Sequence, residues 1–355
     1  MRPIDYDAGP VPPEDVVPFR DPDTGIAGTI VLHSTALGPA AGGCRLWRYA
    51  SDEHATADAL RLAEGMTLKN ALAGLPLGGG KAVLRDPGVP FDRAALFRAF
   101  GRAVEALRGR YVTAEDVGTG VEDMVRVAET SRHVAGLPPR AGRPGGNPSG
   151  WTALGVATAM RVAVRRRLGA ELSDVTVAVQ GLGHVGFALC ELLHAAGAKL
   201  IVAEPRSDVA ARAAVRFGAQ LMSSQALLAA KADVLAPCAL GGVLDFVRVA
   251  QLQVKLVCGA ANNQLFSERQ AEQLADRGIL YAPDFLVNAG GIINVAAEYL
   301  GWDAAEVRRR VEDIGARLDD TLYRADRAGV LPHQAARMEA LDRIAGHARP
   351  LASAA

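Results

Sequence analysis

Apolar and polar residues recur along the chain at spacings that predict a series of helices and strands. Residues 52–73 form a predicted helix, because Leu62, Met66 and Lys69 fall on one face at helical spacing. Gly74 then ends the helix. Lys69 therefore points in the same direction as the apolar side chains. A lysine side chain that is buried there has to be a neutral amine or an ammonium group paired with a negative charge.

The same periodicities predict the other elements. Strands are expected at residues 16–19, 26–33, 81–84, 111–113, 175–180, 198–202, 234–236, 256–258 and 279–282. Helices are expected at residues 93–107, 121–131, 151–168, 184–196 and 332–347, and along the apolar stripe Val307, Val311, Ile314, Leu318 and Leu322. Residues 38–47 are expected to form a glycine-containing loop, and a second glycine-rich stretch, 78–80, precedes the strand that Lys81 opens.

One segment between these elements differs in composition. Residues 136–150 read GLPPRAGRPGGNPSG, with four prolines and five glycines, which is typical of a loop or hinge. A chain of 355 residues is long enough for two domains. We therefore expect an α/β protein of two domains, with the boundary in this segment.

The second predicted domain opens with a dinucleotide-binding pattern. A strand at 175–180 leads directly into Gly181-Leu182-Gly183-His184-Val185-Gly186, then a helix, a second strand and the acidic residue Glu204. The glycines allow a tight turn and a close approach of a pyrophosphate to the helix N-terminus. Glu204 can accept hydrogen bonds from the adenosine ribose, which favours NAD. Arg206 leaves NADP open, because an arginine nearby can accommodate a 2′-phosphate.

Two lysines flank a glycine triplet in the stretch KNALAGLPLGGGK, residues 69–81. Solvated lysines in a helix and a loop are one interpretation. A phosphate-binding P-loop is excluded by spacing, because Leu75 stands where a glycine is needed and Ala82 where Ser or Thr is needed. Asp116 follows a predicted strand and precedes a glycine turn, so a carboxylate lies at that strand end.

Composition narrows the classes of partner. The 39 basic and 39 acidic residues balance, so neither nucleic acid nor a membrane surface is an expected partner. No apolar run reaches the ~18 residues of a membrane span, and the amino terminus lacks the apolar core of a signal peptide. Four scattered cysteines without metal-ligand spacing indicate reduced thiols, no metal site and a cytoplasmic location.

Five motifs, in this order, resemble those of the glutamate, leucine, valine and phenylalanine dehydrogenases. They are GPAAGGCRLW (38–47), GMTLKNALAGLPLGGGKAV (65–83), TAEDVGT (113–119), GLGHVG (181–186) and APDFLVNAGGIINVA (282–296). The resemblance covers residues from about 15 to about 345 and is strongest to phenylalanine dehydrogenase. It implies a homo-oligomer whose NAD-binding, doubly wound Rossmann-type domain (136–329) faces a substrate-binding and oligomerisation domain (1–135) across a catalytic cleft. Helices at about 330–355 return to that first domain.

The resemblance also implies a reaction, the reversible oxidative deamination of an L-amino acid to a 2-oxo acid and ammonia. Lys69 and the Gly42-Gly43 backbone would bind the substrate carboxylate. Lys81 would be the base that activates water, and burial beside Lys69 favours the neutral amine that a base requires. Asp116 would carry a proton to and from the substrate nitrogen. Closure of the cleft would bring the nicotinamide to the substrate.

Further residues match family positions that touch the cofactor or the substrate. The cofactor set comprises Arg45, Ser149, Thr152, Gly181, Leu182, Gly183, His184, Val185, Gly186, Glu204, Arg206, Ala239, Leu240, Ala261, Asn262 and Asn288. Asn262 and Asn288 also match substrate-binding positions, and the side-chain pocket matches Ala41, Ala114, Ile292 and Val295. A surface arginine, a loop serine and a helix N-terminal threonine are the alternative interpretations of Arg45, Ser149 and Thr152.

Substrate choice depends on Ala41 in this reading. Glutamate dehydrogenases place a lysine here for the distal carboxylate, so glutamate is disfavoured. Leucine dehydrogenases typically have a leucine, and the smaller alanine leaves room for an aromatic ring. We therefore expect oxidation of L-phenylalanine to phenylpyruvate. Leucine and valine remain alternatives, because one methylene discriminates by only ~1–3 kcal/mol.

Two other classes are weighed against this one. A non-catalytic NAD-binding regulator would share the glycine motif but would have no use for Lys69, Lys81 and Asp116. A hydroxy-acid dehydrogenase typically pairs a histidine with a carboxylate, and His184 lies inside the glycine motif instead. The residues therefore favour an amino acid dehydrogenase.

Overall fold

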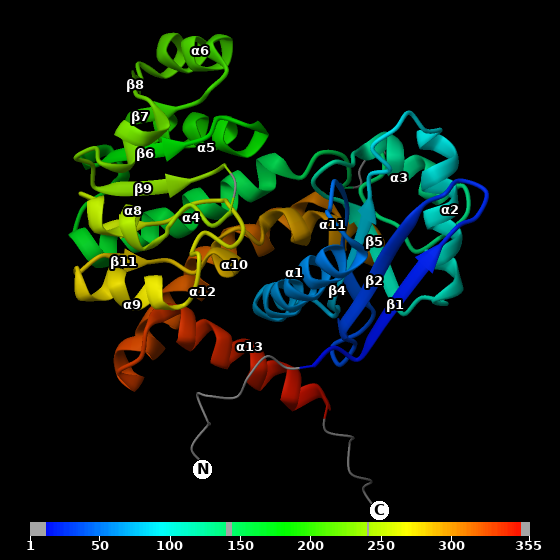
Figure 1. Cartoon of the computed structure of the whole chain (residues 1–355). Coiled ribbons are helices and arrows are strands. Elements are labelled where there is room, and N and C mark those ends of the chain that lie inside the picture. Colours follow the sequence, from blue (N-terminus) through cyan, green and yellow to red (C-terminus); the bar gives the residue numbers. More distant parts are fainter. Residues whose placement is uncertain (1–11, 140–143, 240, 349–355) are drawn as a thin grey trace, which may run out of the picture. The chain divides into compact units, whose positions relative to one another are not determined.

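The computed structural model describes residues 12–139, 144–239 and 241–348. The chain folds into two compact units, one of residues 1–140 and 343–355 and one of residues 141–342. Each unit is built on its own β-sheet and belongs to the α/β class (Figure 1). The boundary at which the chain leaves the first unit and enters the second lies between residues 140 and 141, inside the segment rich in glycine and proline.

The first unit contains a mixed sheet of five strands in the order β1-β2-β4-β3-β5. Its strands are β1 (Asp15–Arg20), β2 (Ala27–Ser34), β3 (Ala40–Trp47), β4 (Gly78–Arg85) and β5 (Tyr111–Glu115). Its helices are α1 (Asp52–Leu72), α2 (Arg93–Ala106) and α3 (Val121–Ala128). The strands β3, β4 and β5 run parallel, whereas β2 runs antiparallel to β1 and β4. The carboxyl ends of the three parallel strands therefore share one edge of the sheet.

Side chains on the two faces of this sheet belong to different apolar cores. Ala82 and Leu84 of β4 pack with Phe97 in the core that includes α2. Val83 packs on the other face with Ala59 in the core that includes α1. In Figure 1, α1 covers one face of the sheet and α2 and α3 cover the other. Because side chains alternate along a strand, the odd-numbered positions of β4 face α1.

The predicted loop at residues 38–47 is wrong, because residues 40–47 form the strand β3 in the middle of the sheet. Glycines in sequence favour a turn, but here they serve the packing of strands. A Cβ atom on Gly42 would lie 1.9 Å from the carbonyl oxygen of Gly80 in the neighbouring strand. Only a residue without a side chain fits between β3 and β4 at this point.

The glycine triplet is also part of a strand, since β4 begins at Gly78 and not at Lys81. Other parts of the chain approach these glycines closely. A Cβ atom on Gly79 would lie 2.1 Å from Thr67 of α1, and one on Gly80 would lie 3.0 Å from the Tyr111 ring. The triplet therefore lets a helix and an aromatic ring pack directly on the strand that carries Lys81.

The second unit contains an all-parallel sheet of six strands in the order β11-β10-β9-β6-β7-β8. Its strands are β6 (Thr176–Gln180), β7 (Lys199–Ala203), β8 (Gln220–Leu221), β9 (Val234–Pro237), β10 (Leu256–Val257) and β11 (Leu280–Tyr281). The strand order reverses direction between β6 and β9, which is the switch point of a doubly wound sheet. The Rossmann-type fold expected from the glycine motif is confirmed.

Helices surround this parallel sheet and continue into the carboxyl-terminal part. They are α4 (Ser149–Leu168), α5 (His184–Ala195), α6 (Ser207–Phe217), α7 (Ser224–Leu228), α8 (Phe246–Gln251), α9 (Arg269–Asp276), α10 (Asp284–Val287), α11 (Gly290–Leu300) and α12 (Ala304–Ala328), with a short 3₁₀ turn at Leu172–Asp174. The predicted apolar stripe of α12 is buried at all five positions: Val307, Val311, Ile314, Leu318 and Leu322.

The last helix, α13 (Pro332–Ala348), contains the second boundary between the units, at residues 342 and 343. Arg343 belongs to the first unit, where its Nη1 donates to the carbonyl oxygens of Ala71 and Leu72 at 3.0 and 3.2 Å. These carbonyls lie at the C-terminal end of α1, where helix carbonyls lack partners in the helix itself. The interaction attaches the end of the chain to α1.

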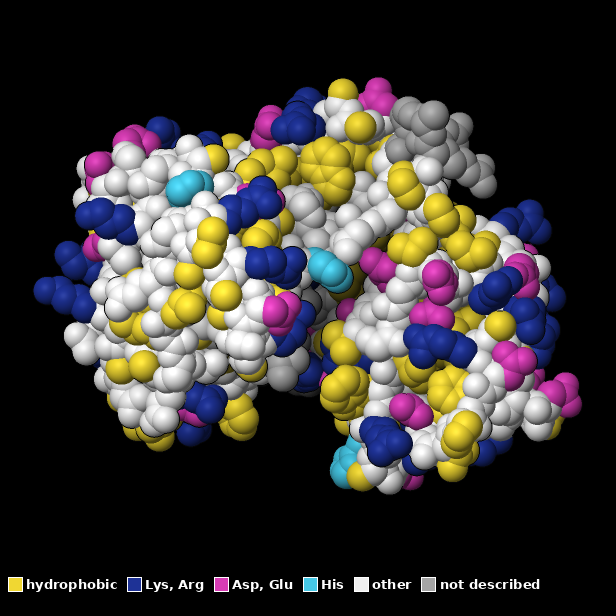
Figure 2. Space-filling model, turned by 90° about the horizontal axis from the view of Figure 1, so that it is seen from above, with side chains coloured by type: hydrophobic (Ala, Val, Ile, Leu, Met, Phe, Trp, Pro, Cys, Tyr) yellow, Lys and Arg dark blue, Asp and Glu magenta, His cyan; other side chains and the backbone are white. Residues whose placement is uncertain are grey.

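The surface carries charges of both signs. Acidic and basic side chains are mixed over the face that Figure 2 shows, without a large field of one sign. In the described part of the chain, we find no helix with the length and apolar character needed to cross a bilayer.

Candidate active site

Lys81 and Asp116 form an ion pair in the first unit, with Lys81 Nζ 3.0 Å from Asp116 Oδ2. Lys81 lies in β4 on the face toward α1, and only 4 % of it is exposed. Asp116 directly follows the last residue of β5, as the sequence predicted. The structure therefore brings together the two residues predicted to carry the chemistry, although they are far apart in the sequence.

Glycines in β3 provide the space between these two side chains. Ala41 pairs with Gly79 and Cys44 with Ala82, so Gly42 and Gly43 run alongside Gly80 and Lys81. A Cβ atom on Gly43 would lie 2.8 Å from the Cβ of Asp116. The absence of a side chain at position 43 therefore leaves room for the carboxylate next to the lysine.

Arg45 is part of this cluster and is not the surface arginine of the alternative interpretation. Its side chain is 18 % exposed, and its Nε donates to Asp116 Oδ2 at 3.1 Å. Burial acts to raise the pKa of Asp116, but the positive charges of Lys81 and Arg45 outweigh it and hold the pKa below its ordinary value. Asp116 is therefore a carboxylate that accepts from two cations through one oxygen.

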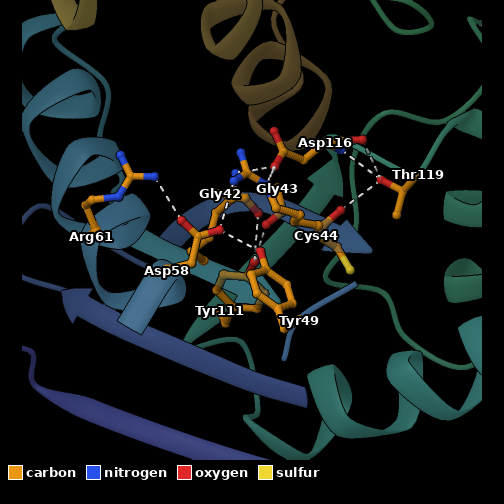
Figure 3. Close-up of polar contacts among 11 residues, drawn as sticks. Gly42, Gly43, Cys44, Tyr49, Asp58, Arg61, Tyr111, Asp116 and Thr119 are labelled. Atoms are coloured by element: carbon orange, nitrogen blue, oxygen red, sulfur yellow. Dashed lines mark hydrogen bonds and ion pairs between the residues drawn. The ribbon is translucent and has the colours of Figure 1, made fainter. Parts of the chain in front are cut away.

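The backbone around Asp116 is held by its neighbours. The Asp116 N–H donates to Thr119 Oγ1 at 2.8 Å, and the same hydroxyl donates to the carbonyl of Cys44 in β3 at 2.8 Å (Figure 3). Arg93 donates to the carbonyl of Gly118 and pairs with both oxygens of Asp123, each at 2.7 Å. The turn that carries Asp116 is therefore fixed from β3 and from α2.

Three residues that the sequence reasoning missed, Asp58, Tyr49 and Arg61, complete the cluster. Asp58 Oδ2 accepts from Arg45 Nη1 at 2.9 Å and from the Tyr49 hydroxyl at 2.6 Å, and Asp58 Oδ1 accepts from Arg61 at 2.9 Å (Figure 3). A signal for Asp58 exists in the sequence. It lies three residues after Ala55, on the apolar face of the predicted helix, where a carboxylate needs a partner.

The residues predicted to bind the substrate carboxylate, Lys69 and the Gly42-Gly43 backbone, lie on α1 and β3, which also carry Asp58 and Arg45. Lys69 is half-buried in the last turn of α1. The Tyr111 hydroxyl, fully buried under β3, donates to the carbonyl of Gly42 at 2.8 Å and to that of Gly43 at 3.3 Å (Figure 3). Burial raises the pKa of Tyr111, so its hydroxyl keeps the proton that it donates. Tyr111 therefore fixes the orientation of the Gly42-Gly43 backbone.

Ala41 and Ala114, predicted to line the side-chain pocket, are each 4 % exposed and lie in β3 and β5. Their positions alternate with Gly42 and Thr113, so both share a face with Lys81. The Ala41 carbonyl accepts from the side chain of Asn70 in α1 at 3.3 Å. Ala41 and Ala114 thus lie on the α1 face of the sheet, together with the Lys81–Asp116 pair.

The second unit holds the predicted cofactor loop. Gly181 has a left-handed backbone (φ 91°), and a Cβ atom on Gly186 would lie 2.0 Å from the Gly181 carbonyl oxygen. Gly183 is the N-cap of α5, and an added Cβ there would meet no atom within 4 Å. The loop therefore leaves open space at a helix N-terminus, the arrangement that accepts a pyrophosphate.

Glu204 follows β7 and is hydrogen-bonded to the glycine loop at residues 181–186. Its Oε2 accepts from the Leu182 N–H at 2.8 Å, and its Oε1 accepts from Arg206 Nε at 2.7 Å. The hydrogen bond from Arg206, together with the Leu182 N–H, lowers the pKa of Glu204 to about 2 against the opposing effect of burial. Arg206 is exposed, but it binds Glu204 and the Leu182 carbonyl at 3.2 Å rather than only facing solvent.

The remaining predicted residues lie in the same unit. Asn288 Nδ2 donates to Asn262 Oδ1 at 3.0 Å and to the carbonyl of Ala260 at 3.1 Å, while its own buried Oδ1 has no partner in the described structure. Ile292 and Val295 are half-exposed on one side of α11.

Other members of the cofactor set lie at loops and helix starts. Ala239 contacts Gly181, Ala261 is buried, Ser149 begins α4, and the Thr152 hydroxyl donates to the Pro148 carbonyl at 3.3 Å. His184 and Val185 open α5. Leu240 lies outside the described residues. Within the described parts of the chain, no cluster of histidine, cysteine or acidic residues is suited to a metal ion.

Two family descriptions match the chain. Residues 13–133 match the Glu/Leu/Phe/Val dehydrogenase dimerisation domain, and residues 147–205 and 201–349 match Glutamate/Leucine/Phenylalanine/Valine dehydrogenase. The fold of two α/β units, with a lysine–carboxylate pair in one and a dinucleotide loop in the other, is that of an amino acid dehydrogenase. The chain belongs to the glutamate/leucine/phenylalanine/valine dehydrogenase family.

Individual relatives lie in several branches of this family. A leucine dehydrogenase of Thermoactinomyces intermedius is 45 % identical over 332 residues, which cover 93 % of this chain and 90 % of the relative. A valine dehydrogenase of Streptomyces coelicolor is 45 % identical, with 95 % and 93 % covered. A phenylalanine dehydrogenase of Bacillus thermotolerans is 40 % identical, with 93 % and 88 % covered. The crystal structure of L-tryptophan dehydrogenase from Nostoc punctiforme superposes with a TM-score of 0.82 at 37 % identity, over 96 % and 98 % of the two chains.

Proposed function

We propose that the protein catalyses the NAD-dependent, reversible oxidative deamination of a branched aliphatic L-amino acid, leucine or valine, to its 2-oxo acid and ammonia. The observation that carries the proposal is the buried pair of Lys81 and Asp116, 3.0 Å apart beside Arg45. A regulator that only senses a nucleotide has no use for a desolvated pair of this kind, which is costly to bury.

The chain's own residues can perform the acid–base steps. Lys69 and the Gly42-Gly43 backbone bind the substrate carboxylate and orient Cα. Asp116 exchanges a proton with the substrate nitrogen. Lys81 first gives up the proton that it shares in the ion pair with Asp116 and then, as the neutral amine, takes a proton of the water that attacks the iminium carbon. When bound, NAD accepts the hydride that leaves Cα. General acid–base catalysis of this kind contributes ~10²–10⁴ to the rate.

The residues of the second unit fit NAD. The open space at Gly183 and the N-terminus of α5 suit a pyrophosphate, and the ionised Glu204 suits the two hydroxyls of an adenosine ribose. A 2′-phosphate would meet that carboxylate. NAD is therefore the proposed cofactor, with Arg206 as the residue that could favour NADP if Glu204 were neutralised.

The choice of substrate departs from the expectation of phenylalanine. The leucine and valine dehydrogenases are each 45 % identical to the chain, and the phenylalanine dehydrogenase is 40 % identical. These relatives support the aliphatic alternative better. Phenylalanine is retained as the second candidate because of one observation, the small side chain of Ala41 on the Lys81 face of the sheet.

A kinetic panel tests this proposal. We expect NADH formation with a higher kcat/KM for L-leucine or L-valine than for L-phenylalanine, and almost none with L-glutamate. Ala41→Leu should lower kcat/KM for phenylalanine more than for valine, because the larger side chain fills the volume that a ring would use. A wild-type preference for phenylalanine would establish the second candidate, and an equal loss on all substrates would remove Ala41 from the pocket.

We further propose that the units act as a substrate-binding and oligomerisation domain and an NAD-binding domain, with the catalytic cleft between them, in a homo-oligomer. The match of residues 13–133 to a dimerisation domain supports the oligomer. All four cysteines are free thiols, which supports a cytoplasmic location. Light scattering of the purified protein tests the oligomer, and a monomer would contradict it.

A further inference from the structure

The cluster around Asp116 extends beyond the residues that the proposed reaction uses. Four charged groups follow one another: Lys81, Asp116, Arg45 and Asp58, joined by contacts of 3.0, 3.1 and 2.9 Å. Each of these three contacts joins opposite charges. The side chains of Arg45, Asp58 and Asp116 are 17–18 % exposed. These four charges cancel, and the row continues from Asp58 in α1 to Arg61, whose side chain is 56 % exposed.

Both carboxylate oxygens of Asp58 accept hydrogen bonds from neighbouring side chains. Its Oδ2 accepts from Arg45 and from the Tyr49 hydroxyl, and its Oδ1 accepts from Arg61. Burial acts to raise the pKa of Asp58, but its three donors outweigh it and lower the pKa below the ordinary value. Asp58 is therefore an ionised, immobilised acceptor for the Arg45 guanidinium.

The two carboxylates hold Arg45 at two different edges. Nε donates to Asp116 and Nη1 donates to Asp58, which fixes both the position and the plane of the guanidinium. An arginine bound only to Asp116 could turn about that single contact. Asp58 thereby determines where Arg45 places its positive charge.

The fixed guanidinium determines which oxygen of Asp116 is available. Lys81 and Arg45 both bind Oδ2, and within the described residues no hydrogen bond or ion pair reaches Oδ1. Oδ1 is then the oxygen that can exchange a proton with a substrate. Loss of the Arg45 contact would let the carboxylate rotate and present either oxygen.

We propose that Asp58, supported by Tyr49, is a positioning residue that acts through Arg45 to hold Asp116 Oδ1 ready for proton transfer. This inference rests on the proposed function. Its consequence is that a carboxylate in α1, separated from the substrate by Arg45 and Asp116, controls the proton-transfer step. Asp58 itself is not among the groups proposed to bind the substrate carboxylate or NAD.

The test compares two carboxylates of the same helix. Asp58→Asn keeps the shape and removes the charge. The matched control is Asp52→Asn, because Asp52 also lies in α1 and also pairs with a strand arginine, Arg85 of β4, at 2.5 Å. Asp52 has no contact with the cluster. Each variant breaks two ion pairs of α1, Asp58 with Arg45 and Arg61, and Asp52 with Arg85 and Arg20. A loss of kcat confined to Asp58→Asn is therefore not a general effect of removing a charge from this helix.

For Asp58→Asn we expect kcat to fall by about 10- to 100-fold, as for a misplaced catalytic group. The KM for the amino acid and the Kd for NAD should stay within about twofold. The solvent deuterium isotope effect on kcat should rise, because proton transfer becomes more rate-limiting. Asp52→Asn should retain the wild-type values of all four quantities.

A second pair of variants keeps the proposal testable if Asp58→Asn does not fold. Tyr49→Phe removes one donor from Asp58 and should raise the isotope effect with a smaller loss of kcat. Arg45→Lys keeps the charge but lacks the planar guanidinium whose Nε and Nη1 donate to two different carboxylates. Combining it with Asp58→Asn should cost no more than either change alone. Additive losses in the double variant would contradict the relay through Arg45.

The failures are distinguishable. If the wild-type protein forms no NADH with any L-amino acid, the proposed function is wrong and the inference fails with it. The inference alone is wrong in two cases in which the wild-type protein forms NADH. Either Asp58→Asn behaves like Asp52→Asn, or its KM for the amino acid rises while its kcat stays unchanged.

Discussion

Two carboxylates, Asp116 and Glu204, are each held by an arginine, but their surroundings differ. Asp116 shares one oxygen between Lys81 and Arg45, and that arginine is held in turn by a second carboxylate. Glu204 accepts from a backbone N–H and from an arginine whose side chain is 58 % exposed. Asp116 keeps one oxygen free of protein donors in the described structure, whereas both oxygens of Glu204 are bonded.

Under the proposed function, Asp116 is the carboxylate placed for proton transfer and Glu204 is the one placed for recognition, and the difference in surroundings agrees with these roles. A recognition carboxylate needs only to remain charged, and a pKa of about 2 ensures this at neutral pH. A carboxylate that exchanges protons needs an accessible oxygen and a neighbouring group to share the proton with, which Lys81 supplies. The predictions below test this contrast, from the largest expected effect to the smallest.

Lys81→Ala should lower kcat by ~10²–10⁴ and leave the Kd for NAD nearly unchanged, because it removes the proposed base and leaves the nucleotide loop intact. Turnover with a leucine and NAD mixture and fluorescence titration with NADH measure the two quantities. The exposed Lys199→Ala in β7 serves as the control. Retention of more than a tenth of the wild-type kcat would show that Lys81 is not the base.

Gly42→Ala should destabilise the protein by about 1–3 kcal/mol, because its Cβ would lie 1.9 Å from a backbone oxygen that cannot move alone. Gly65→Ala is the matched control, since an added Cβ at that position in α1 meets no atom within 4 Å. That change should stabilise the helix slightly. Denaturant unfolding measures both, and equal midpoints would contradict the packing of β3 on β4.

Glu204→Gln should raise the ratio of kcat/KM for NADP to that for NAD by about tenfold, because it removes a negative charge facing the 2′-phosphate and frees Arg206. Lys81 and Asp116 are unaffected, so kcat with saturating NAD should hold. The control Glu191→Gln breaks another Glu–Arg pair of the same unit, with Arg216. No change in the ratio would remove Glu204 from cofactor selection.

Acid unfolding should be less steep in Glu204→Gln than in the wild type. The pKa of Glu204 is lowered in the folded protein to about 2, from about 4.3 in an unfolded chain. Its contribution is therefore complete above about pH 4.3 and is lost as the pH falls toward 2. We expect about 1 kcal/mol after allowance for solvent around Arg206. Circular dichroism between pH 5 and 2 compares the curves, and parallel curves would contradict the shift.

The two carboxylates also differ in how far the sequence could predict their surroundings. The strand, glycine turn, helix and acid of the cofactor loop lie within 29 residues, from Thr176 to Glu204, so their geometry follows from local rules. The Arg45–Asp116 contact joins residues 71 positions apart, and only the pairing of β3 with β5 creates it. Lys81 and Asp116 could be named from motifs, but Asp58, the second carboxylate that holds Arg45, could not.

The glycine-rich strands show a second limit of sequence reasoning. Glycines predict turns because they are flexible, and that rule failed for β3 and for the start of β4. In both strands the glycines are required by neighbours that come from distant parts of the chain. The sequence patterns likewise do not predict the helix α11, which begins with two glycines, because helical propensity disfavours glycine and tertiary packing against α4 outweighs it.

Gly78, Gly79 and Gly80 have a practical meaning for protein engineering. Each is closed to mutation by a different neighbour, the Ser34 carbonyl at 1.9 Å, Thr67 at 2.1 Å and the Tyr111 ring at 3.0 Å from the missing Cβ. We expect a combinatorial library across these codons to consist mainly of destabilised variants. Screening effort for altered substrate range belongs instead on the half-exposed side of α11, where the proposed pocket residues Ile292 and Val295 can change size without moving a strand.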